Sequence, residues 1–123
     1  MKPSSIKFHR QSQTLELAYL SEIFILPAEY LRVFSPSAEV QGHGPNQQVL
    51  QHGKLNVQIK SLEAQGNYAL KLIFNDGHDS GIFTWGYLYE LGKNQLNNWT
   101  DYEERLRETG KRRDPAETVV RLL

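Results

Sequence analysis

The chain has 123 residues, 39 % of them hydrophobic and 11 % aromatic, which supports one packed domain and excludes disorder throughout. Its 14 basic and 14 acidic side chains cancel, so no net positive charge attracts nucleic acid or an anionic membrane. The absence of cysteine excludes disulfides, thiolate nucleophiles and cysteine-based zinc sites. No run reaches the roughly 18 apolar residues of a membrane span, and the opening residues lack a signal-peptide pattern, so we expect a cytoplasmic protein.

Alternating apolar and polar side chains in the first half of the chain predict three short strands, at residues 6–9, 15–19 and 23–26. Pro27 favours the first turn of a helix that follows directly, because its missing N–H removes no helical hydrogen bond there. Pro36 ends this helix, since the residue before a proline avoids helical dihedral angles. The next stretch, residues 37–53, is predicted to be a loop.

The second half predicts more hairpins and a second short helix. The expected elements are a strand at 55–59 with 62–64 as its partner, a strand at 68–74, a loop at 75–81, a strand at 82–84, and a helix at 85–91 ended by Gly92. The order of strand, turn, strand and short helix therefore occurs twice. Duplication of one unit and chance both explain so short a pattern.

A third predicted helix follows, in which Leu96, Trp99, Tyr102 and Leu106 form one apolar face, with Gly110 as its C-cap. We divide the chain into a domain at 1–92, an amphipathic extension at 93–110 and a tail at 111–123, and leave the order of the tail open. The expected fold class is α+β, a single domain of mainly antiparallel strands in hairpins, with short helices after them and a C-terminal amphipathic helix.

His78 is the first candidate for chemistry, because Asp76 and Asp79 flank it in the predicted hairpin loop. Imidazole and carboxylate ligands suit zinc or iron, and His43, which lies between two glycines, could complete a site with His78 and Asp79. The alternative is structural: a turn shaped by Asp76 and Gly77 with a partly exposed His78, and a simple loop around His43.

Signatures of autonomous catalysis are missing from the sequence. It has no Gly-x-Ser-x-Gly elbow, no phosphate-binding loop and no dinucleotide fingerprint. We therefore expect that the chain is not an enzyme.

Three stretches carry a family resemblance: residues 26–40 (LPAEYLRVFSPSAEV), 66–69 (GNYA) and 74–88 (FNDGHDSGIFTWGYL). In order, spacing and residue type they resemble the small bacterial family named for the N-terminal domain of gamma-butyrobetaine hydroxylase, formerly a domain of unknown function. The resemblance covers residues 6–92 and implies an α+β domain of largely antiparallel strands. It implies little about activity, because fold and function are separable.

In the hydroxylases, the resemblance implies, this module precedes an iron-dependent oxygenase domain and holds a structural zinc through three cysteines and one histidine. The histidine matches His78, whereas the cysteine positions fall at Ser35, Ser37 and Val40. Two hydroxyls and a valine cannot replace three thiolates, so that zinc site is not expected here.

Similar modules are also appended to plastid ATPase-type iron–sulfur carrier proteins. The resemblance therefore also implies a docking or accessory role in the delivery of clusters or metal. Our first hypothesis is a non-catalytic interaction module linked to iron–sulfur or metalloenzyme maturation, with a protein partner and without nucleic acid or membrane. The second is a protein that binds iron or zinc through His78 and nearby carboxylates. A homo-oligomer is compatible with both. The predicted binding surface is Tyr30, Arg32, Asp76, His78, Asp79 and Trp85, with core packing as the alternative for Tyr30 and Trp85.

Overall fold

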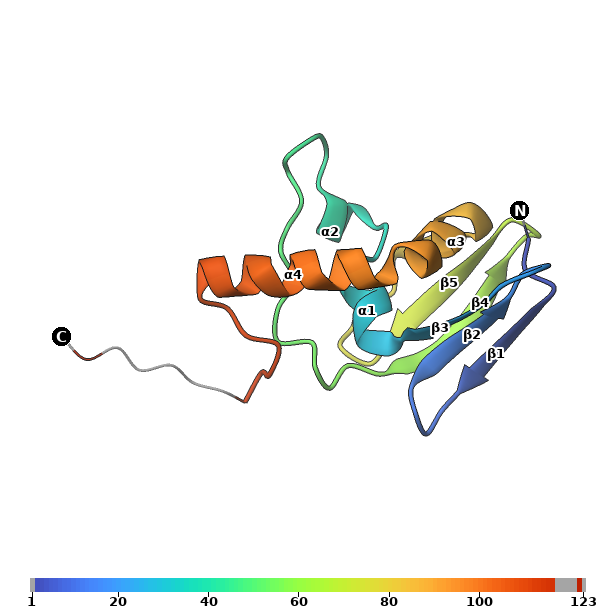
Figure 1. The fold of residues 1–123 in the computed structure, drawn as a ribbon, viewed down its shortest axis with the longest axis horizontal. Coiled ribbons are helices and arrows are strands. Elements are labelled where there is room, and N and C mark those ends of the chain that lie inside the picture. The colour runs from blue at the N-terminus through green and yellow to red at the C-terminus, as the bar shows by residue number, and fades with distance from the viewer. Residues whose placement is uncertain (1, 117–121, 123) are drawn as a thin grey trace.

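A computed structural model describes residues 2–116 and 122, and its architecture is the expected α+β fold of two antiparallel three-stranded sheets and covering helices (Figure 1). The first sheet has the order β1-β2-β3, with β1 at Ser5–His9, β2 at Thr14–Ala18 and β3 at Ile23–Pro27. Helix α1 (Ala28–Val33) follows without a loop, because Pro27 ends β3 in an extended conformation and serves as the N-cap of α1.

The second sheet repeats this plan in the order β4-β5-β6, with β4 at Ile59–Gln65, β5 at Ala69–Phe74 and β6 at Gly81–Thr84. Helix α3 (Trp85–Lys93) again follows directly, and the Thr84 hydroxyl caps it by accepting a hydrogen bond from the Tyr87 N–H at 3.2 Å. The repeated pattern in the sequence thus corresponds to two meander-and-helix units. Their common origin by duplication stays untested.

The inner faces of both sheets share one hydrophobic core. Leu15 and Leu17 of β2 lie opposite Leu26 and Phe24 of β3, and their alternation is the reason for this register. In the second sheet Leu70 lies opposite Phe83 on the same inner side. The Tyr19 hydroxyl donates to the Trp85 carbonyl at 2.9 Å, and so joins the two units.

Helix α4 (Gln95–Thr109) crosses α1, as Figure 1 shows, and ends at Gly110 in the left-handed conformation expected of a C-cap. Tyr102 and Leu106 are buried in a second cluster with Val33, while Leu96 is 79 % exposed, contrary to its expected place on the buried face. The helix is packed onto the rest of the fold. The predicted division between residues 92 and 93 falls in the last turn of α3, and it stays a prediction.

Two predictions in the middle of the chain are wrong. Residues 55–58 of the expected strand form a turn and an irregular segment, and Ile59 is the first residue of β4. Residues 62–64 lie within the same strand, which pairs with β5 instead. The Leu55 N–H donates to the Arg113 carbonyl at 3.0 Å, so this backbone is bonded to the C-terminal segment and not to a neighbouring strand. A one-turn helix, α2 (Ala38–Gln41), lies in the expected loop, too short to produce an apolar periodicity.

The C-terminal segment is anchored to the fold at Arg112 and Arg113. Arg112 and Arg113 accept backbone hydrogen bonds from Gly53 and Leu55, and the Arg113 guanidinium pairs with Glu29. The rest of the predicted tail, residues 117–121 and 123, lies outside the described residues. Within the described ranges, no helix has the length and apolar character needed to cross a bilayer.

Candidate functional site: a buried histidine network

His78 lies in the turn between β5 and β6 with its ring directed into the protein. Gly77 has φ 88°, a left-handed conformation that favours glycine, and the Asp76 carboxylate accepts a hydrogen bond from the His78 N–H at 3.2 Å. The His78 carbonyl accepts from the Phe74 N–H at 2.9 Å. The residue is only 3 % exposed, so the expectation of a partly exposed His78 is wrong.

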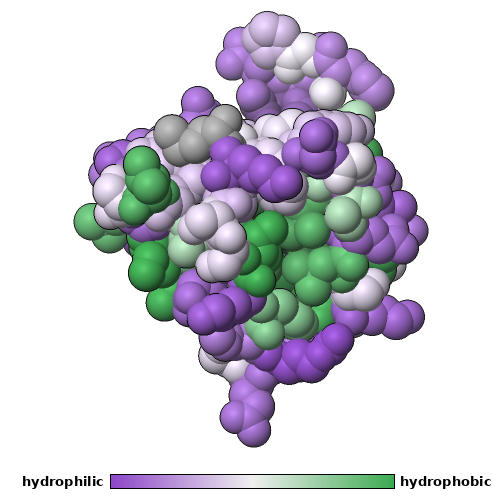
Figure 2. Space-filling model, turned by 90° about the vertical axis from the view of Figure 1, so that its right-hand side faces the viewer, coloured by the Kyte–Doolittle hydropathy of each residue, from purple (hydrophilic) through white to green (hydrophobic). Residues whose placement is uncertain are grey.

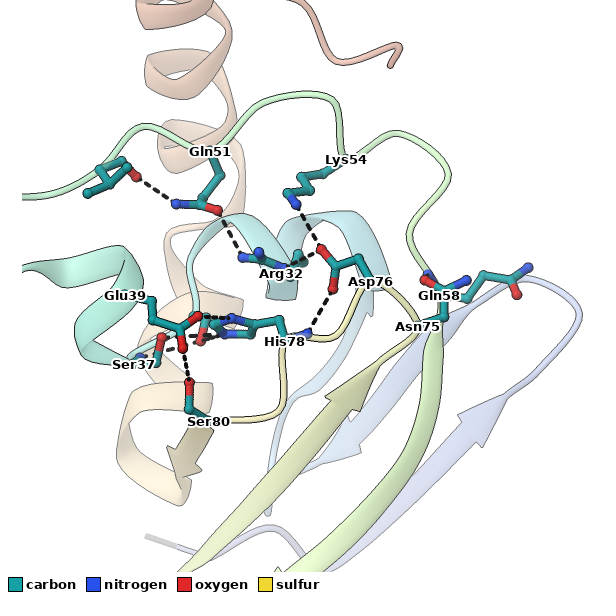
Figure 3. Close-up of polar contacts among 12 residues, drawn as sticks. Arg32, Ser37, Glu39, Gln51, Lys54, Gln58, Asn75, Asp76, His78 and Ser80 are labelled. Atoms are coloured by element: carbon teal, nitrogen blue, oxygen red, sulfur yellow. Dashed lines mark hydrogen bonds and ion pairs between the residues drawn. The ribbon is translucent and has the colours of Figure 1, made fainter. Parts of the chain in front are cut away.

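Both nitrogens of this ring have partners (Figure 3). Nδ1 lies 3.1 Å from the Glu39 carboxylate, and Nε2 lies 2.8 Å from the Ser35 hydroxyl and 3.4 Å from that of Ser37. Because a carboxylate only accepts, Nδ1 carries the proton and donates to Glu39, which leaves Nε2 to accept from Ser35. The histidine network, defined as Ser35, Ser37, Glu39 and His78, therefore joins the α1–α2 segment to the β5–β6 turn.

The three positions where the resemblance places cysteines lie in this segment, and two of them contact His78. A tetrahedral zinc site needs about four thiolate, imidazole or carboxylate ligands. Here one imidazole meets two neutral hydroxyls, and the Val40 side chain has no donor atom. The side chains present do not fit a zinc ion, and a hydrogen-bond network occupies the corresponding place.

The connectivity from Ser35 to His78 to Glu39 is that of a serine-hydrolase triad, and no sequence motif predicts it. A nucleophile must reach a substrate, however, and Ser35 is fully buried. A Cβ at Gly81 would come within 2.6 Å of the Ser35 hydroxyl oxygen, which shows how closely the backbone covers it. This geometry supports a structural role for the three side chains.

Asp76 connects the turn to a second group of polar side chains. Its carboxylate accepts from Arg32 Nε at 2.9 Å and from Lys54 Nζ at 2.8 Å, and Arg32 also donates to the Gln51 side chain at 3.0 Å (Figure 3). Burial raises the pKa of Asp76, but the hydrogen bonds from Lys54 and Arg32 outweigh it and lower the pKa to about 2. Asp76 is thus ionised across the physiological range.

Desolvation lowers the pKa of His78 below its usual value, and the Arg32 charge acts in the same direction. The hydrogen bond and charge of Glu39 oppose this shift, but the Glu39 side chain is 69 % exposed, so water screens its charge. The neutral imidazole is therefore the form that the fold favours.

The remaining predicted site residues lie apart from the network. Tyr30 and Trp85 are buried, and their polar atoms donate to the carbonyls of Leu91 and Asn67. Asp79 and His43 are exposed. Four of the six predicted surface residues, Tyr30, Arg32, His78 and Trp85, are therefore less than a tenth exposed, which favours core packing as the explanation for the two aromatic ones.

A metal centre at His78, His43 and Asp79 finds no support in the geometry. Across residues 2–116 and 122, no three or more His, Cys, Asp or Glu side chains form a group that could hold an ion. Sequence reasoning also missed several side chains of the histidine network and of the polar group around Asp76. The resemblance pointed to Ser35 and Ser37, whereas nothing in the sequence pointed to Glu39, Gln51 or Lys54.

Two meander-and-helix units joined by such a network define a small α+β module. The chain belongs to the family described as gamma-butyrobetaine hydroxylase-like, N-terminal, whose model matches residues 6–89. Comparison with curated proteins gave no match.

Solved structures extend this likeness over the whole chain. Two proteins with NMR solution structures are similar to it. One is 56 % identical with a TM-score of 0.84, covering 99 % of this chain and 97 % of that one. The other is 43 % identical with a TM-score of 0.79, covering 99 % and 92 %. A crystal structure of a DUF971-family protein of unknown function from Acidithiobacillus ferrooxidans ATCC 23270 is 32 % identical with a TM-score of 0.61, covering 74 % and 92 %.

Proposed function

We propose that this chain is a non-catalytic protein-interaction module. The observation that carries the proposal is the amount of apolar surface that stays exposed on this small fold, while the polar side chains of the histidine network are hydrogen-bonded to one another. Figure 2 shows hydrophobic residues gathered in a hollow on one face, bordered by hydrophilic ones. Large apolar side chains that remain exposed include Ile23, Ile25, Tyr68, Ile82 and Leu96. Contiguous exposed apolar surface marks interaction sites in soluble proteins.

The partner in this proposal is a protein and not a nucleic acid or a membrane surface, because 14 basic and 14 acidic side chains leave no net charge. The finer part of the proposal is a link to iron–sulfur or metalloenzyme maturation. Its support is the family alone, whose modules stand beside an iron-dependent oxygenase domain or an iron–sulfur carrier. In this account the partner holds the metal, since the histidine network offers no ligand set.

Photo-cross-linking in cells tests the proposal. A photoreactive amino acid replaces one exposed apolar residue at a time, Ile25 or Tyr68, and the exposed Glu104 of α4 serves as the control position. We expect one protein to be cross-linked from an apolar position and not from Glu104. That protein, purified, should bind the purified chain in calorimetry with at least micromolar affinity. Identical products from all three positions, or no binding between the purified proteins, would refute the module.

A further inference from the structure

A groove lies between the start of α1, the α3–α4 junction and the first turns of α4. Its volume of about 600 Å³ falls within the usual range of binding sites. We call it the α1–α4 groove, and the lining residues used below are Pro27, Tyr30, Lys93, Leu96, Trp99 and Arg113. It is separate from the histidine network.

Aromatic and aliphatic side chains form the body of this groove. The rings of Tyr30 and Trp99 meet edge to face with centroids 6.2 Å apart. The Tyr30 hydroxyl donates to the Leu91 carbonyl and accepts from Asn98, so its polar atom is already paired within the protein. Leu96 precedes Trp99 by one helical turn and is 79 % exposed, which leaves an apolar wall open to solvent.

The charges at the groove are unequal. Its one acidic side chain, Glu29, is buried and accepts two hydrogen bonds from the Arg113 guanidinium, at 2.8 and 2.7 Å. Arg113 also stacks on Trp99, with its guanidinium carbon 5.1 Å from the ring centroid. Lys93, which pairs with Glu22 at 3.1 Å, has a half-exposed side chain on the other side. The accessible charges that line the groove are therefore cationic.

An apolar strip leads from the first sheet into the groove. Alternate residues of a strand point to the same face, and Ile23, Ile25 and Pro27 are the exposed residues of β3. Pro27, the last of them, lines the groove and so makes the strip continuous with it. The combined surface is longer than the groove and suits an extended or helical segment better than a compact metabolite.

We propose that the α1–α4 groove and the outer face of β3 bind a short segment of a partner protein that combines apolar side chains with an acidic residue. The apolar side chains pack against Tyr30, Leu96 and Trp99, and the carboxylate faces Lys93 and Arg113. This inference rests on the proposed function and gives the partner's chemistry. A nucleic acid is disfavoured because Glu22 and Glu29 stand beside the only two cations that line the described groove.

Selection of random phage-displayed peptides against the full-length chain tests this inference. The expected winners combine apolar residues with Asp or Glu, and shift the backbone amide signals of β3 and of residues 92–99 in NMR spectra. Leu96→Glu should lower the affinity for a synthetic copy of a selected peptide more than tenfold, because it places a charge in the apolar wall. Val49→Glu, an equal charge change at a 54 % exposed residue outside the groove, should leave the affinity within twofold.

Lys93→Gln separates the acidic requirement from the apolar one. We expect it to weaken an acidic peptide about threefold to tenfold, with a smaller salt dependence than in the wild type. It should not change the affinity of the same peptide with its acidic residue amidated. Selected peptides without acidic residues, or peptides whose affinity is unchanged by Leu96→Glu, would overturn the inference without refuting the interaction module.

Two further outcomes would replace the partner with the chain itself and so overturn the inference. One is self-association in sedimentation that Leu96→Glu abolishes. The other is peptide binding that begins only when the chain is shortened to end at Ala116, which would make the chain's own tail the occupant. Failure of the cross-linking experiment above, in contrast, would refute the module as a whole.

Discussion

Removal of the His78 ring is the sharpest perturbation of the histidine network, because it leaves the fully buried Ser35 hydroxyl without its 2.8 Å partner. An unsatisfied buried hydroxyl costs about 1–3 kcal/mol. The cavity left by the imidazole beside Phe74 adds about 2 kcal/mol. We therefore expect His78→Ala to lower the free energy of unfolding by about 3–5 kcal/mol, a large share of the roughly 5–15 kcal/mol typical of a domain.

Urea unfolding followed by tryptophan fluorescence measures this loss, and thermal unfolding should show a fall in Tm of about 10–20 °C. His43→Ala is the matched control, since His43 is exposed and should change stability by less than about 0.5 kcal/mol. If His78→Ala fails to fold, Ser35→Ala provides the weaker perturbation, with a loss of about 1–2 kcal/mol. A His78→Ala protein as stable as His43→Ala would refute the reasoning.

The remaining predictions concern pH and close packing. Because the pKa of His78 is lowered on folding, its contribution to stability is present above the unfolded value of about 6.5 and is lost as the pH falls through the lower folded pKa. Wild-type stability should therefore fall more steeply between about pH 7 and 5 than that of His78→Ala, and parallel curves would contradict this. Asp76→Asn should cost about 1–2 kcal/mol at pH 7, because the pKa of Asp76 is lowered to about 2 and solvent screening reduces the energy of that shift, and most of the cost should be lost as the pH falls from 3.8 to 2. A cost that is undiminished at pH 2 would mean that charge is not the cause. Gly92→Ala should cost about 1–3 kcal/mol, because its Cβ would lie 2.4 Å from the Phe24 ring, whereas Gly86→Ala in the same helix has open space and should be neutral or stabilising by about 0.5 kcal/mol. Equal unfolding free energies for the two glycine variants would show that the contact is not tight.

Sequence reasoning predicted the parts of this fold that rest on local periodicity. The alternation of Leu15 and Leu17, or of Leu70 and Leu72, determines which face of a strand enters the core, so β1, β2, β3, β5 and β6 could be anticipated. The positions of α1, α3 and α4 could be anticipated as well. The prediction of a strand from alternating side chains was wrong at Leu55, because the Leu55 N–H donates to the carbonyl of the distant Arg113 and not to a neighbouring strand. A contact across 58 positions leaves no mark in a local pattern.

The histidine network shows the same limit at the level of the site. His78 stood out because two acidic residues flank it, yet its ring contacts Ser35 and Glu39, some forty positions away, and not Asp79. The family resemblance indicated this proximity where residue spacing could not, since it assigned Ser35, Ser37 and His78 to positions of the same zinc site in the related hydroxylases. Burial of Tyr30 and Trp85 could be weighed only as an alternative, because a large aromatic residue suits a core and a binding surface equally well.

The most direct test of the central claim, that this chain acts through a surface and carries no metal centre, is native mass spectrometry with elemental analysis. The full-length protein is purified without a tag, under anaerobic conditions, from cells supplied with iron and zinc, beside His78→Ala. We predict that the wild-type mass equals that of the bare folded chain. One iron or zinc per chain, lost in His78→Ala, would contradict the account and make metal binding the function.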